Sequence, residues 1–184
     1  MAAATVCLKG CSTASGGNWQ NAGVVSETGT VASLHLHPEV AGEALREVAE
    51  ARAEAGMGLI GDLRVFGRRR RDGEPSDRQV SLIAREEIAR HAAALGLAGI
   101  APGAVRSNIE TTGIDPVSFL GCEMEIGEAV LIFCEARKPC HKMDLVAPGL
   151  QALMSQGRQG VLARVLRSGR IRVGDAIRLV ARPG

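Results

Sequence analysis

After Gly96 the sequence divides into short, strand-like segments that glycine and proline separate. The segments span residues 104–109, 123–126, 129–135, 160–166, 171–173 and 176–180. Two joints between them are alike, at 125–130 and 172–177, where an apolar residue and glycine precede an acid, alanine and a β-branched residue. Glycine at such a joint suits the tight turn of a β-hairpin. Many short strands at close spacing predict a mainly β fold, either a barrel or a sandwich.

Other patterns predict further strands and a few helices. Residues 30–37 alternate in a way that predicts a half-buried strand, and 79–83 has the composition of a short apolar strand. Apolar residues at helical spacing predict helices over 39–55, 84–95 and 144–156. The expected architecture is therefore a β core with peripheral helices.

His35 and His37 fall on the same face of the strand expected at 30–37. Two histidines at this spacing can hold a metal ion, but no third ligand is evident close to them in sequence. We therefore favour a hydrogen-bonded or solvent-facing pair over a metal site.

The composition excludes several classes of protein. The chain has 184 residues, of which 46% are hydrophobic, and this predicts one domain with a sizeable core. Only 2% are aromatic, so the core must be aliphatic and a base-stacking platform for single-stranded nucleic acid is disfavoured. The net charge of +2 is too small to indicate a general polyanion binder. Nucleic acid is therefore not an expected partner.

We expect residues 1–28 to form an N-terminal tail or arm and residues 29–182 to form a single domain. No segment resembles a signal peptide or approaches the roughly 20 apolar residues of a membrane-spanning helix. The five cysteines show no disulfide framework. These features predict a cytoplasmic protein with reduced thiols and no membrane contact.

Positive charge is concentrated in one segment. Between Arg64 and Arg78 there are six arginines and three acidic residues, which are Asp72, Glu74 and Asp77. Runs of like charge are usually solvated, so the segment is expected to be a surface loop. A loop that rims a small anionic ligand is the functional alternative.

Cys140 is the cysteine whose neighbours favour reactivity. Arg137, Lys138, His141 and Lys142 flank it, and it lies between an expected strand and an expected helix start. Cationic neighbours and helix N-terminal N–H groups stabilise the thiolate, the form that attacks sulfur or binds a soft metal. Cys140 is therefore the candidate catalytic residue and the candidate metal ligand. A buried structural thiol is the alternative.

The other four cysteines have settings that predict no chemistry. Cys7 and Cys11 lie in the tail, and two thiols at this spacing cannot complete a tetrahedral metal site. Cys122 and Cys134 suit packing in an aliphatic core.

Residues 102–113 carry a second group of functional side chains. Arg106, Ser107, Asn108, Thr111 and Thr112 supply guanidinium, amide and hydroxyl groups in close order. This chemistry suits an anionic, heteroatom-rich ligand such as a phosphorylated heterocycle. A solvated strand face is the alternative.

A succession of motifs resembles the MOSC domain, which is named for the C-terminal domain of molybdenum cofactor sulfurases. The motifs are Gly61-Asp62, the strand at 78–83, the segment 103–113, Gly121 with 126–128, and Arg137-Lys-Pro-Cys140. Their order and spacing match from about residue 29 to residue 180.

The resemblance implies a closed β-barrel with peripheral helices, of the kind also found in the pyruvate kinase barrel. It also implies that the chain binds the molybdenum cofactor, permanently or transiently, through its anionic pterin part. Family members carry a functional cysteine at the position of Cys140. The resemblance extends cofactor binding to the polar strand residues Arg106, Ser107, Asn108, Thr111 and Thr112, and we add the neighbours of the thiol, Arg137, Lys138 and His141.

Three functions remain open. In the first, Cys140 is a sulfur carrier or sulfurtransferase that holds sulfur as a persulfide and receives it from a donor such as a cysteine desulfurase. In the second, Cys140 ligates molybdenum in a small reductase of N-hydroxylated or N-oxygenated compounds, which needs an electron-transfer partner. In the third and least favoured, the chain is a non-catalytic anion-binding module.

Overall fold

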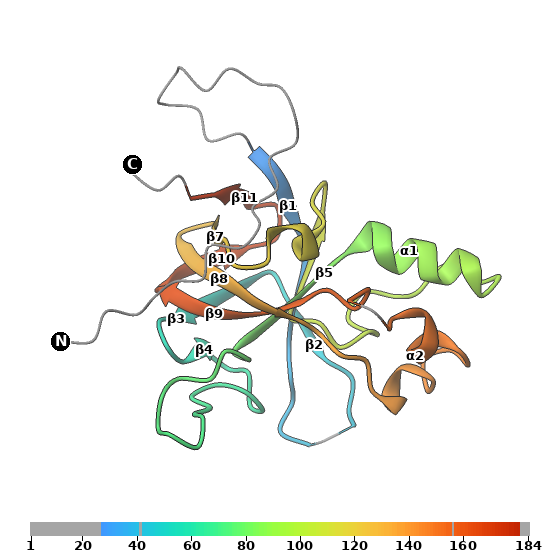
Figure 1. Ribbon diagram of the computed structural model, residues 1–184, viewed down its shortest axis with the longest axis horizontal. Helices are drawn as coiled ribbons and strands as arrows, with labels where there is room; N and C mark the ends of the chain where they lie inside the picture. The colour runs from blue at the N-terminus through green and yellow to red at the C-terminus, as the bar shows by residue number, and fades with distance from the viewer. Residues whose placement is uncertain (1–26, 41, 156, 181–184) are drawn as a thin grey trace.

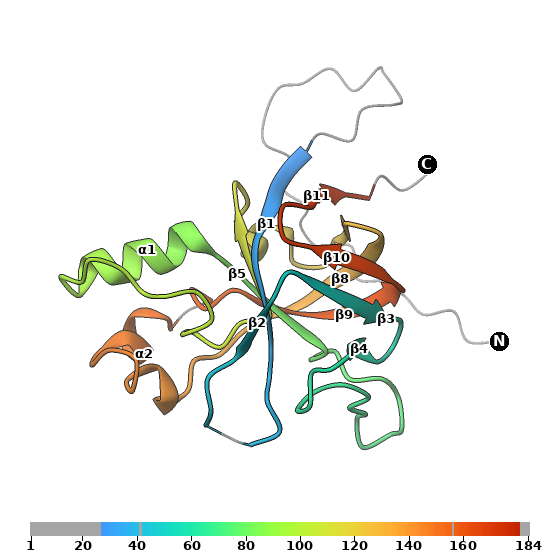
Figure 2. The same ribbon diagram turned by 180° about the vertical axis from the view of Figure 1, so that it is seen from behind.

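Seven strands of the computed structural model close into a barrel (Figures 1 and 2). The structure describes residues 27–40, 42–155 and 157–180. The strands follow the order β11-β7-β8-β9-β5-β6-β1, and the pairing of β1 with β11 closes the ring. Their bounds are β1 Glu27–Leu36, β5 Val80–Ala84, β6 Ile109–Thr112, β7 Glu123–Ile126, β8 Ala129–Ala136, β9 Val161–Arg167 and β11 Ala176–Leu179.

Four further strands lie outside this ring. Strand β2 (Arg46–Val48) pairs with β1, while β3 (Glu50–Glu54), β4 (Gly58–Leu59) and β10 (Gly169–Arg172) form a separate three-stranded sheet. The prediction of a mainly β, closed barrel is confirmed, and the sandwich alternative is excluded.

The helices are few and short. Strands β5 and β6 are parallel, so the chain must cross over between them, and helix α1 (Arg85–Ala94) begins that crossover. Two 3-10 helices, η1 (Pro116–Phe119) and η2 (His141–Met143), and helix α2 (Leu150–Leu153) complete the described elements. Both views place α1 and α2 together at one side of the barrel (Figures 1 and 2). Among the described residues, no helix is long and apolar enough to span a membrane.

Two aliphatic clusters hold the fold together. The first fills the barrel and includes Leu34, Leu82 and Leu131, all completely buried. The second lies under the helices and joins Ile88 of α1 to Met143 of η2. Because Met143 is fully buried, the short segment that begins at Cys140 is anchored to the body of the protein.

The helix predicted over 39–55 is wrong. The structure has β2 and β3 there, with Ala51 and Ala53 buried in alternation. Val40 is 57% exposed and Ala44 is also exposed, so the apolar stripe at helical spacing has no core to face. Pairing of β3 with β10 and β4 decides the local structure instead.

Three other expectations need correction. The strand predicted at 104–109 begins only at Ile109, after a turn. The helix predicted over 144–156 is reduced to α2, because Gly149 enters the helix with a left-handed φ of 86°. The strand at 30–37 is buried on both faces, since Ser33 and His35 are buried as well as Leu34.

Candidate functional site

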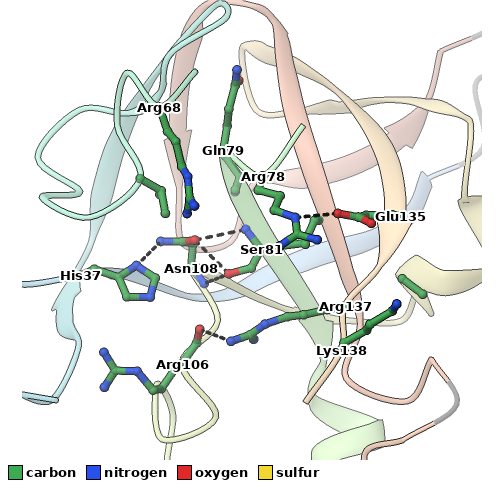
Figure 3. A pocket seen from close by; sticks show the side chains of 14 residues that line it. His37, Arg68, Arg78, Gln79, Ser81, Arg106, Asn108, Glu135, Arg137 and Lys138 are labelled. Atoms are coloured by element: carbon green, nitrogen blue, oxygen red, sulfur yellow. Dashed lines mark hydrogen bonds and ion pairs between the residues drawn. The ribbon is translucent and has the colours of Figure 1, made fainter. Parts of the chain in front are cut away.

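A cavity of about 240 Å³ opens where the end of β8 faces β5 and the segment before β6 (Figure 3). Five cationic side chains line it, against a single carboxylate, that of Glu135. The cations are Arg68, Arg78, Arg106, Arg137 and Lys138. The cavity is therefore strongly electropositive.

Most of these cations have no ionic partner. Arg78 donates from Nε to Glu135 Oε1 at 2.8 Å. Within the part of the chain that the structure describes, no salt bridge involves Arg68, Arg106, Arg137 or Lys138. Unneutralised cations around one cavity form a site that favours an anion.

Arg137 is the most constrained of these cations. Its Nη1 donates to Val105 O at 3.2 Å and its Nη2 to Arg106 O at 2.9 Å. Burial, opposed by negative charge on Cys140 and assisted by the charge of Arg106, lowers the pKa of the Arg137 guanidinium to about 10. Arg137 therefore joins the segment before β6 to the segment that leads to Cys140.

Arg106 adopts an unusual backbone conformation. Its φ is 59°, and no other non-glycine residue in the described ranges has a positive φ. Its N–H donates to Gly103 O at 2.9 Å, and its Nη1 donates to Glu43 O at 2.8 Å. A left-handed residue other than glycine costs of order 1–3 kcal/mol and is frequent at functional sites.

A hydrogen-bonded network fixes one wall of the cavity. The Oδ1 of Asn108 accepts from Ser81 N at 3.1 Å and from Ser81 Oγ at 2.9 Å, while its Nδ2 donates to His35 O at 3.1 Å and Asp62 Oδ2 at 2.7 Å. Through these hydrogen bonds Asn108, which is 1% exposed, links β1 to β5. Figure 3 shows His37, Asn108 and Ser81 side by side along this wall.

His37 and Asp62 form a pair at the edge of the same wall. His37 Nδ1 lies 2.7 Å from Asp62 Oδ2, and the backbone N–H of His37 also donates to that oxygen. The expectation of a hydrogen-bonded histidine holds for His37. It fails for His35, which is buried and has no hydrogen bond on either ring nitrogen among the described residues.

Asp62 has a lowered pKa despite its burial. Burial acts to raise the pKa of the carboxyl group, but the hydrogen bond and the charge of His37, with backbone N–H donors, outweigh it. The N–H groups of Arg64 and Val65 both donate to its Oδ1 at 3.1 Å. Asp62 is therefore ionised at neutral pH.

Cys140 lies outside the cavity lining, close to its cationic side. It is exposed, and it precedes η2 at the N-cap position. Three peptide units separate Cys140 from Arg137, so their Cα atoms are at most about 11 Å apart. In contrast, burial raises the pKa of the half-buried Cys134 to about 11, with Asp77 adding to the effect.

The structure divides the residues that the sequence singled out. Four of them line the cavity, namely Arg106, Asn108, Arg137 and Lys138. The exposed Cys140 and His141 come two and three positions after Lys138 in the sequence. Ser107, Thr111 and Thr112 do not line the cavity. Ser107 bonds to Ile109 O, Thr111 to Ile83 O and Ile114 O, and Thr112 to Thr30. Cys7 and Cys11 lie outside the described residues.

Several residues of the site were missed. His37 and Asp62 are 25 positions apart, and nothing in their local patterns predicts that they meet. Arg68 comes from the arginine-rich loop, where the run of like charge favours a solvated surface over a place at a ligand. Arg78 and Ser81 belong to a motif of the resemblance, but no function was attached to them. No group of three or more His, Cys, Asp or Glu side chains in the described ranges could hold a metal ion.

Fold and site together define a small β-barrel protein with a cationic cavity and an exposed thiol beside it. The sequence matches the MOSC domain family over residues 34–178, so the chain belongs to that family. The MOSC domain is associated with the molybdenum cofactor, which makes this a molybdenum-cofactor-related protein. No curated protein sequence matches it significantly.

Solved structures support the fold. The YuaD protein from Bacillus subtilis superposes with a TM-score of 0.69 at 20% identity, covering 84% of this chain and 97% of that one. YiiM from Geobacillus stearothermophilus gives 0.65 at 20% identity, covering 84% and 76%. YiiM from Escherichia coli gives 0.60 at 21% identity, covering 84% and 71%. All three likenesses concern the barrel architecture.

Proposed function

We propose that this chain binds the anionic part of the molybdenum cofactor in the cationic cavity and carries sulfur on Cys140. The observation that carries the proposal is the set of four cavity cations that form no salt bridge with a carboxylate of the described residues, with an exposed thiol beside them. Balanced surface charges need no ligand, whereas these cations gain stabilisation when an anion enters.

The residues present fit the charged part of such a cofactor. Arg68, Arg106, Arg137 and Lys138 would hold its phosphate, since guanidinium and ammonium groups are the usual phosphate partners. A cavity of about 240 Å³ is somewhat smaller than the usual range for a drug-sized ligand, so it suits the charged end of a larger molecule. When bound, the cofactor supplies a molybdenum centre that accepts sulfur.

Cys140 would act as the sulfur carrier. Its thiolate attacks the terminal sulfur of a donor persulfide, such as that of a cysteine desulfurase. The S–S bond of the donor breaks, the donor leaves as a thiolate with the electron pair, and Cys140 becomes a persulfide. The exposure of Cys140 supports this role because a protein donor must reach the thiol. Its position outside the cavity lining gives no comparable support to a role as molybdenum ligand.

Persulfide formation tests the carrier role. Purified protein is incubated with a cysteine desulfurase and cysteine, and intact-mass and peptide spectrometry locate the added sulfur. We expect a gain of one sulfur on the peptide that contains Cys140 and no gain in Cys140→Ser. The matched control is Cys134→Ser, which should keep the modification because the raised pKa of Cys134 leaves that thiol protonated. Sulfur that persists in Cys140→Ser would contradict the proposal.

A further inference from the structure

Of the two ring nitrogens of His37, one is hydrogen-bonded to another described residue and the other is not. Nδ1 lies 2.7 Å from the Asp62 carboxylate. Nε2 makes no hydrogen bond to any described residue, although the side chain is only 14% exposed. His37 also lines the cationic cavity. Nε2 therefore belongs to a residue that lines the cavity in which an anion would bind.

Asp62 holds this imidazole in a defined protonation pattern. The carboxylate is fully buried and receives hydrogen bonds from Asn108 and from the N–H groups of Arg64 and Val65. Because the pKa of Asp62 is lowered, the group is an acceptor, and Nδ1 of His37 is the donor to it. A second proton on the ring can therefore be gained or lost only at Nε2.

The charges around His37 oppose one another. Asp62 stabilises a protonated ring, and the carboxylate of Glu135, which lines the same cavity, acts in the same sense. Positive groups come from β2, the loop after β4, the segment before β5, the turn before β6 and the segment after β8. They are Arg46, whose guanidinium approaches Gly61, and the cavity cations Arg68, Arg78, Arg106, Arg137 and Lys138. Without an anion these cations disfavour a further positive charge. With an anion in the cavity that repulsion is offset.

We propose that His37 is a proton-coupled anion-binding residue, which takes up a proton at Nε2 when a doubly charged oxyanion of the phosphate or sulfate class enters the cavity. Asp62 is its positioning residue. The proposal rests on the proposed function because it assumes that the cavity binds an anion. It goes further in assigning to His37 both a direct contact with the ligand and control of its affinity by pH.

Sulfate is the best probe because it does not titrate near neutrality, so any pH dependence reports on the protein. Binding is measured by calorimetry from about pH 6 to about pH 8, where histidine changes charge. For uptake of one proton, the Kd should rise by up to about tenfold per pH unit in the steep part of the curve. Heats in buffers of different ionisation enthalpy should show proton uptake on binding.

Two variants test whether the pH dependence of sulfate binding arises from His37 and Asp62. His37→Gln should bind sulfate with a Kd that is nearly independent of pH and close to the weak value of the native protein at about pH 8. Asp62→Asn should keep part of the binding but move the steep region to lower pH. The matched control is His91→Gln on α1, which lies away from the cavity and should keep the native slope. Amide NMR spectra establish that each variant is folded.

The outcomes separate this inference from the proposed function. Sulfate binding with a Kd that does not vary with pH, or an unchanged slope in folded His37→Gln, overturns the role of His37 and leaves the cavity as an anion site. Absence of sulfate binding at every pH overturns the cavity as an anion site and this inference with it.

Discussion

Arg106 illustrates how much one residue can contribute to this site. Its side chain reaches Glu43 O, its carbonyl accepts from Arg137, and its backbone has a φ of 59°. Glycine would adopt this conformation without strain, whereas alanine would not. An arginine at a position that favours glycine indicates that its charge has a function. Substitution by glycine and by alanine can separate the effect of the lost charge from the effect of backbone strain.

We expect Arg106→Gly and Arg106→Ala to weaken sulfate binding equally, since both remove the cation. Their stabilities should differ. Arg106→Gly should stay within about 1 kcal/mol of the native protein, because relief of strain offsets the lost hydrogen bond. Arg106→Ala should be less stable than Arg106→Gly by about 1 kcal/mol. Urea unfolding measures the difference. Equal stability of the two variants would show that the backbone relaxes at this position.

At the same scale, the sequence was a partial guide to the site. Cys140, Arg137 and Lys138 are adjacent, so their chemistry is visible in one short segment. His37 and Asp62 become neighbours only because β1 and the loop after β4 meet at Asn108. Thr111 and Thr112 have the right chemistry for a ligand, but the hydrogen bonds of β6 use their hydroxyls. Contacts between distant segments decide which polar side chains are available.

Among the elements, the junction of β9 with β5 leaves least room for change. Gly160 precedes β9 with a φ of 80°, and a Cβ there would lie 1.9 Å from Leu82 O. The carbonyl of Gly160 also accepts from the N–H of Arg137. A side chain at Gly160 would therefore push apart two strands of the barrel and move a residue of the cavity.

We expect Gly160→Ala to be severely destabilised, by more than about 3 kcal/mol, because backbone atoms must move to relieve the clash. Gly174→Ala provides the matched control, since Gly174 also has a positive φ but has nothing within 4 Å of its Cβ position. That control should lose only about 1–2 kcal/mol from backbone strain. Thermal and urea unfolding of both variants test the contrast. A similar small loss in both would show that β5 and β9 can separate locally.

The prediction of elements succeeded where pairing and pattern agreed and failed over the segment 39–55. The strands at 123–126 and 129–135 have branched or bulky apolar residues, and the structure contains both. The segment 39–55 is rich in alanine, which has the highest helix propensity, yet Ala51 and Ala53 pack in a strand. Small side chains there fit beneath a short sheet, and this constraint comes from β10, far along the chain.

For the whole molecule, charge distribution matters more than total charge. The chain has a net charge of +2, but the cavity alone carries five cations and one carboxylate. Elsewhere arginines are commonly paired, as Arg170 is with Glu128 and Arg172 with Glu50. Four cations that form no salt bridge with a described residue therefore gather at one cavity, and composition alone could not reveal this clustering.

The clustering of cations at the cavity predicts which substitutions of cationic residues lower the cofactor content of the protein. The variant with both Arg68→Gln and Lys138→Gln should copurify with about 5- to 30-fold less molybdopterin and molybdenum than native protein, at about 0.5–1 kcal/mol per lost contact. The matched control removes two exposed cations away from the cavity, Arg90→Gln with Arg178→Gln, and should retain native content. Pterin fluorescence after oxidation and elemental analysis provide the measurements. Equal loss in both double variants would contradict a localised site.

The pairing of β1 with β11 also has a consequence for biosynthesis. These are the first and last strands of the barrel in sequence, so the nascent chain cannot complete the ring until β11 has left the ribosome. Until then the backbone groups of β1 and β7 that pair with β11 remain open, and open edges recruit other chains. Synthesis of this protein therefore includes an interval in which these strand edges are exposed, and chaperone binding protects them most effectively during that interval.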